Sequence, residues 1–109
     1  MAYDAVLAER VRRLAPKGRG FVEKKMFGGV GFLLHGNMCV GVWKEYLIVR
    51  IGPEAYDEAL EQPYVCEFDI TGRPMKGWVM VEPAGLHRES ELAEWVERAV
   101  GFVSELPAK

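Results

Sequence analysis

Hydrophobic and polar positions at the start of the chain repeat with the period of a helix. Leu7, Val11 and Leu14 stand at i, i+4 and i+7, and most of the neighbouring arginines lie off this stripe. Asp4 is suited to the N-terminal end of such a helix, and Pro16 to a position beyond its last turn. We therefore expect an amphipathic helix with one apolar face.

An alternating pattern follows and predicts three strands, over 26–34, 38–43 and 46–51. The first two are separated by the turn residues 35–37. The second and third are separated by residues 44–45, which are suited to a two-residue reversal. Successive strands joined by such short turns predict an antiparallel meander.

The first of these strands has one face that is nearly bare in its middle, because Gly29 and Gly31 occupy it. Bare glycines in a strand indicate a bulge, a bend, or a helix or aromatic ring lying against the backbone. In the second strand the alternation predicts two faces, one with Met38, Val40 and Val42 and the other with Cys39, Gly41 and Trp43.

The second half of the chain predicts a short helix over 53–62, strands over 65–70 and 77–81, and a closing helix over 88–105. The core stripe of the closing helix is Leu92, Trp95, Val96, Ala99, Val103 and Leu106. The order is therefore α-β-β-β-α-β-β-α. It predicts an α+β fold with a five-stranded, mainly antiparallel sheet and packed helices, in a single domain over 1–109.

Composition agrees with a small cytoplasmic protein. The chain has 109 residues, half of them hydrophobic, and no apolar run approaches the ~20 residues of a membrane span. We therefore expect no membrane association. Two cysteines lie far apart outside any Cys-x-x-Cys spacing, and Cys39, in an apolar segment, is expected to be a buried reduced thiol.

Charge is unevenly distributed along the chain, although the net charge is only −2. Residues 10–25 hold seven cations and one acid, whereas residues 54–69 hold six acids and no cation. This distribution predicts either charged helix faces that keep the protein soluble or a basic patch for an acidic partner.

No catalytic or metal-binding constellation is predicted. The glycines at 28, 29 and 31 lack the Gly-Lys-Ser/Thr ending of a nucleotide loop, and the two histidines have no second ligand at metal spacing. The two serines lie at or in the closing helix, which gives a Ser-His-Asp arrangement little support. We therefore expect no catalytic residue, no metal and no cofactor.

The stretch over 71–78 carries more chemistry than a turn needs. Gly72 and Pro74 shape the turn, which leaves Arg73 and Lys76 free to project. Met75 and Trp78 are expected either in the core or at a contact surface. The candidate residues for binding a partner or an anion are Lys24, Lys25, Arg73, Met75 and Lys76.

The chain resembles the N-terminal domain of the TfoX/Sxy family, the regulators of natural competence. The resemblance rests on the segments 25–32, 36–38, 41–44 and 68–78. The residues that characterise these motifs are Phe27, Gly28, Gly29, Gly31, Trp43, Gly72, Pro74, Gly77 and Trp78. The resemblance implies an α+β domain with a five-stranded antiparallel sheet and a role in transcriptional regulation or protein interaction. It implies no enzymatic activity, no cofactor and no catalytic residues.

Three hypotheses of function follow. The first is a small non-enzymatic regulatory or protein-interaction module that binds an unknown protein partner, as a monomer or a homodimer. The second is a nucleic-acid-binding accessory protein that places the cations of residues 10–25 on phosphates, which the negative net charge disfavours. The third is an enzyme or small-ligand protein that binds an anion with the glycine-rich strand and the loop around Arg73 and Lys76.

Overall fold

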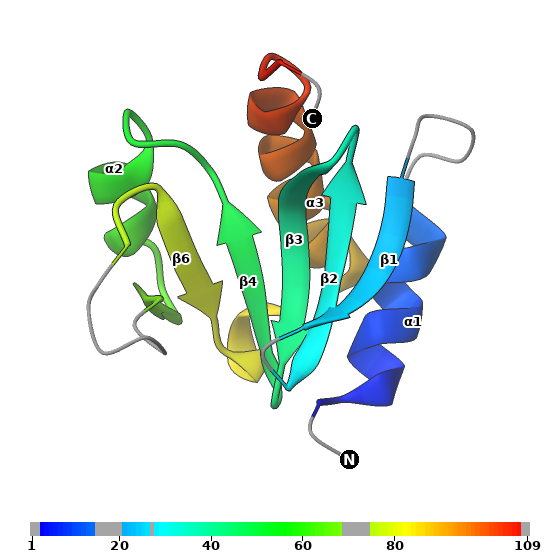
Figure 1. Cartoon of the computed structure of the whole chain (residues 1–109). Helices are drawn as coiled ribbons and strands as arrows, with labels where there is room; N and C mark the ends of the chain where they lie inside the picture. Colours follow the sequence, from blue (N-terminus) through cyan, green and yellow to red (C-terminus); the bar gives the residue numbers. More distant parts are fainter. Residues whose placement is uncertain (1–2, 15–20, 27, 69–74, 108–109) are drawn as a thin grey trace.

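The computed structural model describes four stretches of the chain: residues 3–14, 21–26, 28–68 and 75–107. Three α-helices, one 3-10 helix and six strands lie within these stretches (Figure 1). In chain order they are α1 (Ala5–Leu14), β1 (Phe21–Met26), β2 (Gly29–Leu34), β3 (Asn37–Trp43), β4 (Tyr46–Arg50), α2 (Tyr56–Leu60), β5 (Val65–Glu67), β6 (Trp78–Val81), η1 (Pro83–Gly85) and α3 (Glu89–Val103).

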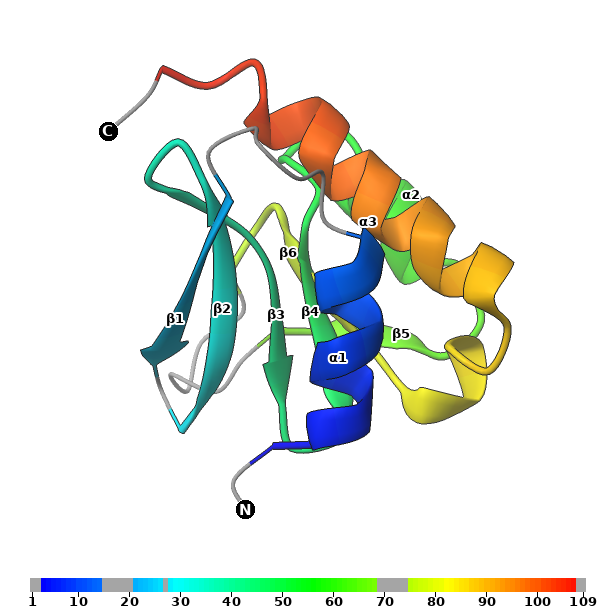
Figure 2. The same cartoon turned by 90° about the vertical axis from the view of Figure 1, so that its right-hand side faces the viewer.

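The strands form one antiparallel sheet in the order β1-β2-β3-β4-β6-β5. Helices α1, α2 and α3 all lie on the same side of this sheet (Figure 2). We call that side the helix face and the opposite side, toward the viewer in Figure 1, the second face. The predicted α+β class and antiparallel sheet are confirmed.

The predicted number of five strands is wrong, because β1 was not foreseen. Its sequence, Phe-Val-Glu-Lys-Lys-Met, has no alternation of apolar and polar positions, and four of its six residues are exposed. An edge strand can carry such a pattern, since only one of its sides is paired and charges there discourage pairing with other chains. The predicted strand over 26–34 therefore contains the last residue of β1, Met26, and the whole of β2, with the turn residue Gly28 between them. The order in the described residues becomes α-β-β-β-β-α-β-β-α.

The two predicted turns of the meander are confirmed. His35 and Gly36 both have positive φ angles, 52° and 85°, between β2 and β3. This is the left-handed backbone of the two-residue turns that match the twist of a hairpin. Lys44, with φ 53°, begins the second turn, and the pair Trp43–Tyr46 closes it.

The predicted faces of β3 are wrong at its N-terminal end, because a β-bulge interrupts the register. Phe32 pairs with Val40 while Leu33 pairs with Met38, so Cys39 is an extra residue. Met38 therefore packs with the apolar side chains of the second face, and Cys39 lies in the core under the helices. The bulge lies beside the glycines at which the sequence predicted a bulge, a bend or a close approach.

The main core lies between the helix face and the three helices. Its strand side chains are buried valines, leucines and an aromatic ring from every second position of β2, β3, β4 and β6, with Cys39 added at the bulge. The predicted stripe of α3 is confirmed, since its five residues within the helix are buried and Leu106, just beyond, is half-buried. The alternation of the strands and the stripe of α3 thus meet in one apolar layer. None of the described helices is both long and apolar enough to span a membrane.

Candidate functional site

The second face is organised by a row of residues that are paired across all six strands. From one edge to the other, the paired residues are Lys24, Gly31, Gly41, Ile48, Met80 and Cys66. A lysine thus stands at one end of the row, apolar side chains at the other, and two adjacent glycines between them. Four strand spacings separate β1 from β6, or roughly 19 Å at about 4.8 Å per strand.

The backbone of Gly31 is covered by the side chain of Met26. A Cβ atom on Gly31 would lie 3.0 Å from both the Sδ and Cε atoms of Met26. The close neighbour expected at this glycine is therefore a thioether from the adjacent strand β1, and not a helix or an aromatic ring. Since Met is flexible, this covering side chain can rearrange when another surface approaches.

Large apolar side chains gather over β3, β4 and β6 on the second face. Ile48, Phe68 and Met80 are buried, and half-buried residues pack around them: Met38, Trp43, Tyr46, Cys66, Met75 and Trp78. Trp43 and Tyr46 are stacked with ring centroids 6.2 Å apart, and Phe68 and Trp78 have centroids 5.9 Å apart. These rings form a fixed apolar patch, with methionines around it that can adapt.

Two cations beside the apolar patch, Lys44 and Arg50, lie over aromatic rings. The Lys44 Nζ atom is 4.6 Å from the centroid of Trp43, and the Arg50 guanidinium is 5.1 Å from that of Trp78. Arg50 is also 5.9 Å from the ring of Phe102. These contacts hold the positive charges beside the apolar patch.

No carboxylate accompanies these cations among the described strand residues of the second face. The register places 22, 24, 26, 29, 31, 33, 38, 41, 43, 46, 48, 50, 66, 78 and 80 on that face, and none of them is Asp or Glu. Within the described part of the chain, Lys24, Lys44, Arg50 and Lys76 also take part in no ion pair. The described strand residues of the second face are therefore mainly apolar, and the cations beside them are not neutralised by any described carboxylate.

The predicted basic segment behaves differently, because its arginines are paired with carboxylates. Arg10 contacts Glu89 at 2.7 Å, and Arg12 contacts Glu23 at 2.7 Å and Glu9 at 2.6 Å. The hydrogen bond from Arg12 lowers the pKa of Glu23, and the same bond raises the pKa of Arg12. These arginines connect α1 to α3 and β1. Their pairing favours the prediction of charged helix faces that keep the protein soluble over the prediction of a basic patch for an acidic partner. Lys17 and Arg19 lie outside the described residues.

The two lysines of the predicted contact edge point to opposite faces of the sheet. Lys24 pairs with Gly31 on the second face, whereas Lys25 pairs with the buried Val30 on the helix face. Both side chains are exposed. Of this pair, only Lys24 shares a face with the apolar patch.

The predicted contact loop is described from Met75 onward, and Gly72, Arg73 and Pro74 lie outside the described residues, as does Phe27. Met75 and Trp78 are both half-buried against the apolar patch. Each side chain is thus partly packed, as a core residue would be, and partly accessible, as a contact residue would be. Lys76 is exposed in the turn between them.

The glycines of the motifs hold turns and close backbone contacts. Gly28, with φ 77°, lies in the turn between β1 and β2. Gly77 has φ 98°, and its carbonyl accepts hydrogen bonds from the N–H groups of Ile51 and Gly52 at 2.9 and 3.1 Å. A Cβ atom on Gly77 would lie 3.3 Å from the backbone of Gly52 and Pro53. Gly77 thus fixes the end of the loop against the end of β4.

Sequence reasoning missed Arg50 because its importance depends on rings that are distant in sequence. Arg50 ends β4 opposite Trp78 of β6 and reaches Phe102 of α3. Only the pairing of β4 with β6 brings these residues together. In the sequence, the one signal that pointed to Arg50 was its position as a cation at the end of an apolar strand.

Burial and hydrogen bonding account for the shifted pKa values of Cys39 and Tyr56. Cys39 is fully buried, as predicted, and burial raises the pKa of its thiol to about 12. Burial and a hydrogen bond to Glu67 raise the pKa of Tyr56. No cluster of three or more His, Cys, Asp or Glu suited to a metal ion occurs among the described residues.

Comparison with known proteins agrees with the motifs on β2, β3 and the loop before β6. No curated protein and no solved structure matches the chain significantly. The family model of the TfoX N-terminal domain matches residues 13–103, from the end of α1 to the end of α3. Because this match covers most of the chain, the protein belongs to the TfoX N-terminal domain family.

Proposed function

We propose that this chain is a small non-enzymatic regulatory domain, like those of competence regulators, which binds an acidic protein segment on the second face of its sheet. The observation that carries the proposal is the combination on that face of half-buried aromatic and methionine side chains with unpaired cations and no described carboxylate. Aromatic residues, Met and Arg are enriched in the buried centres of protein interfaces.

Charge complementarity defines the partner. Lys24 and Lys76 are exposed, and Lys44 and Arg50 lie beside the rings of the patch. A segment with Asp or Glu near large apolar side chains would satisfy both the cations and the rings. The roughly 19 Å between β1 and β6 corresponds to about six residues of extended chain at ~3.3 Å per residue.

A protein partner is favoured over nucleic acid for two reasons. Binding to phosphates depends mainly on the number of cations, and the second face has few beside a large apolar patch. In addition, the arginines expected to bind phosphates, Arg10, Arg12 and Arg13, contact carboxylates of this same chain.

The causes of the pKa shifts support the non-enzymatic part of the proposal. Catalytic groups tend to have strongly perturbed pKa values in a cleft. The shifts of Arg12, Glu23, Cys39 and Tyr56 each have an evident cause in hydrogen bonding or burial that requires no catalytic role.

A pair of matched charge reversals tests this function. The variant Lys24→Glu/Lys76→Glu changes the second face, and the control Lys25→Glu/Arg88→Glu changes two exposed cations elsewhere by the same net charge. Quantitative affinity capture should find a partner whose recovery falls at least about fivefold with the first variant and is unchanged with the control, since two rim pairs contribute up to about 1 kcal/mol each. Crosslinks from that partner should come from an acidic segment.

Other outcomes would reject the proposal. Equal recovery of every partner with both variants would remove the second face as a binding site. In a second experiment, the unchanged protein and both variants are titrated with duplex and single-stranded DNA at low salt, and binding is measured. DNA binding that the first variant abolishes and the control retains would make nucleic acid the ligand of this face.

A further inference from the structure

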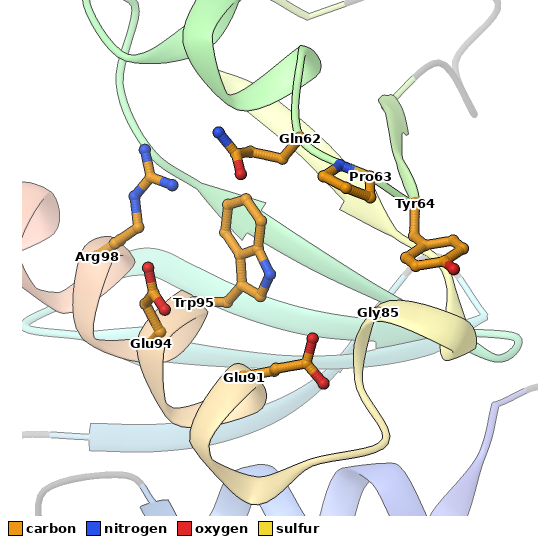
Figure 3. Close-up of a pocket in the computed structure, with 8 residues that line it drawn as sticks. All are labelled: Gln62, Pro63, Tyr64, Gly85, Glu91, Glu94, Trp95 and Arg98. Carbon is orange, nitrogen blue, oxygen red and sulfur yellow. The ribbon is translucent and has the colours of Figure 1, made fainter.

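A small pocket lies at the other side of the molecule, between α3 and the loop that joins α2 to β5 (Figure 3). Its volume is about 190 Å³, below the roughly 300–1,000 Å³ of a typical small-molecule site. Trp95 forms its centre, with Pro63 and Tyr64 on one side and Glu91, Glu94 and Arg98 along α3. The size fits one long side chain better than a larger ligand.

The indole N–H of Trp95 points into this pocket without an acceptor. Trp95 is only 9% exposed, and none of the hydrogen bonds of the described residues involves its ring nitrogen. Figure 3 shows the nitrogen edge of the indole turned toward the side of Pro63, Tyr64 and Glu91. The ring is nearly buried, but its N–H is open to solvent, because no buried side-chain nitrogen or oxygen of the described residues lacks a hydrogen-bond partner. The N–H is therefore free to donate to an acceptor that enters the pocket.

Two carboxylates at the pocket are also without a cation. Glu91 and Glu94 are exposed, and in the described structure neither takes part in an ion pair. The neighbouring Arg98 does not neutralise them, because it contacts Glu58 of α2 at 2.8 Å. Arg98 also lies over the Trp95 ring, 4.9 Å from its centroid, so this indole already stacks with one guanidinium.

Tyr64 forms an aromatic wall of the pocket. It is 51% exposed and has a φ of 65°, a left-handed conformation that is uncommon for a bulky residue. Its backbone is held by the hydrogen bond from the Glu82 N–H to its carbonyl at 2.8 Å. A Cβ atom on Gly85 would lie 3.1 Å from the Tyr64 Cβ, so a larger residue there would require Tyr64 to shift by a few tenths of an ångström.

We propose that this pocket binds an arginine side chain of a partner protein. The guanidinium would contact Glu91 and Glu94 beside Tyr64, and a backbone carbonyl of the same partner segment would accept the Trp95 indole N–H. Arginine suits the site better than lysine, because its planar group stacks on aromatic rings and forms paired hydrogen bonds with carboxylates. This site is separate from the second face and does not depend on the function proposed for that face.

Titration with a small probe tests the site directly. The probe is N-acetyl-arginine N-methylamide, and the readout is the indole ¹H–¹⁵N resonance of Trp95, assigned with the Trp95→Phe variant. We expect a saturable shift in the millimolar range. The corresponding citrulline compound has nearly the same shape without the charge, and it should bind at least about fivefold more weakly. No saturable shift, or equal binding of the two compounds, would overturn the proposal.

Two sets of variants assign the interaction to its residues. Glu91→Gln/Glu94→Gln should weaken arginine binding about three- to tenfold, as expected for two exposed ion pairs. The control Glu97→Gln/Glu105→Gln removes two exposed carboxylates that do not line the pocket, and it should leave binding unchanged. Trp95→Phe, followed through the Tyr64 backbone amide, should weaken binding about two- to tenfold. Equal affinity of the first variant and its control would reject the site.

Discussion

Replacement of Gly52 by Ala tests the packing that holds the end of β4, the loop before β6 and α3 together. Gly52 has a φ of 89°, and its N–H donates to the carbonyl of Gly77 at 3.1 Å. A Cβ atom there would lie 2.5, 2.6 and 3.0 Å from three atoms of the Phe102 ring. The substitution therefore strains the backbone and also displaces a half-buried ring of α3.

Two costs and one compensating gain determine the expected loss of stability. A left-handed backbone costs a non-glycine residue about 1–2 kcal/mol, and displacement of Phe102 from part of its contacts costs about 1–2 kcal/mol more. Reduced freedom of the unfolded chain returns roughly 0.5–1 kcal/mol. The net loss for Gly52→Ala is then about 2 kcal/mol in the free energy of unfolding.

Urea unfolding of four variants separates these terms. Gly101→Ala is the matched control, because this exposed glycine of α3 has no atom within 4 Å of the added Cβ. It should stabilise the protein by about 0.5–1 kcal/mol, the helix preference of Ala over Gly. In a Phe102→Ala background, Gly52→Ala should lose only the backbone part of its cost.

Either of two results would refute this reasoning. The first is a Gly52→Ala variant within about 0.5 kcal/mol of the unchanged protein. The second is an equal cost of Gly52→Ala with and without the Phe102 ring, since a double-mutant cycle would then show no coupling between the two residues.

Three further predictions concern other parts of the fold. Arg12 lowers the pKa of Glu23 in the folded protein. The pair therefore stabilises the protein at pH values above the pKa of Glu in the unfolded chain, about 4.3. This stabilisation is lost as the pH falls through the lower pKa that Glu23 has in the folded protein. Glu23→Gln should therefore cost about 0.2–1 kcal/mol at pH 7 and nothing in strong acid, as measured by urea unfolding, and an equal cost at both pH values would contradict the pairing. Burial and the raised pKa of Cys39 should make its alkylation by iodoacetamide at least about a hundredfold slower than in urea-unfolded protein, followed by peptide mass spectrometry; equal rates would show that Cys39 is accessible. Asn37→Ala removes the 2.9 Å hydrogen bond from the buried side-chain amide to the Pro107 carbonyl and should cost about 1 kcal/mol in thermal or urea unfolding, whereas no change would mean that this contact is not formed in solution.

Local patterns were sufficient to predict most of the fold. Alternation predicted β2, β3 and β4, and the helical stripe predicted α3, because one side of each element is buried in the same core. β1 could not be recognised, since an edge strand with four exposed residues has no such pattern. The bulge at Cys39 could not be placed either, because a single extra residue is decided by the pairing with β2 and changes which face each side chain occupies.

The candidate sites depended more strongly on contacts between distant residues. Lys24 and Lys25 are neighbours in sequence, but the register sends them to opposite faces. Trp95 was predicted as a core residue, and it is buried as expected. Its significance as the centre of a pocket appears only when the loop with Tyr64 lies across α3. Periodicity predicts which side chains are buried, whereas the chemistry of a site depends on which distant residues the fold brings into contact.

The central claim is that the second face binds an acidic segment with large apolar side chains. The most direct measurement is selection of a random-peptide library on the unchanged protein, with removal of peptides that also bind Lys24→Glu/Lys76→Glu, followed by ¹H–¹⁵N mapping of the selected peptides. The account predicts peptides rich in Asp or Glu beside aromatic or aliphatic residues, which shift the resonances of β1, β3, β4 and β6 and bind less tightly as salt increases. Selected peptides that are basic or uncharged, or that shift mainly α1 and α3, would contradict it.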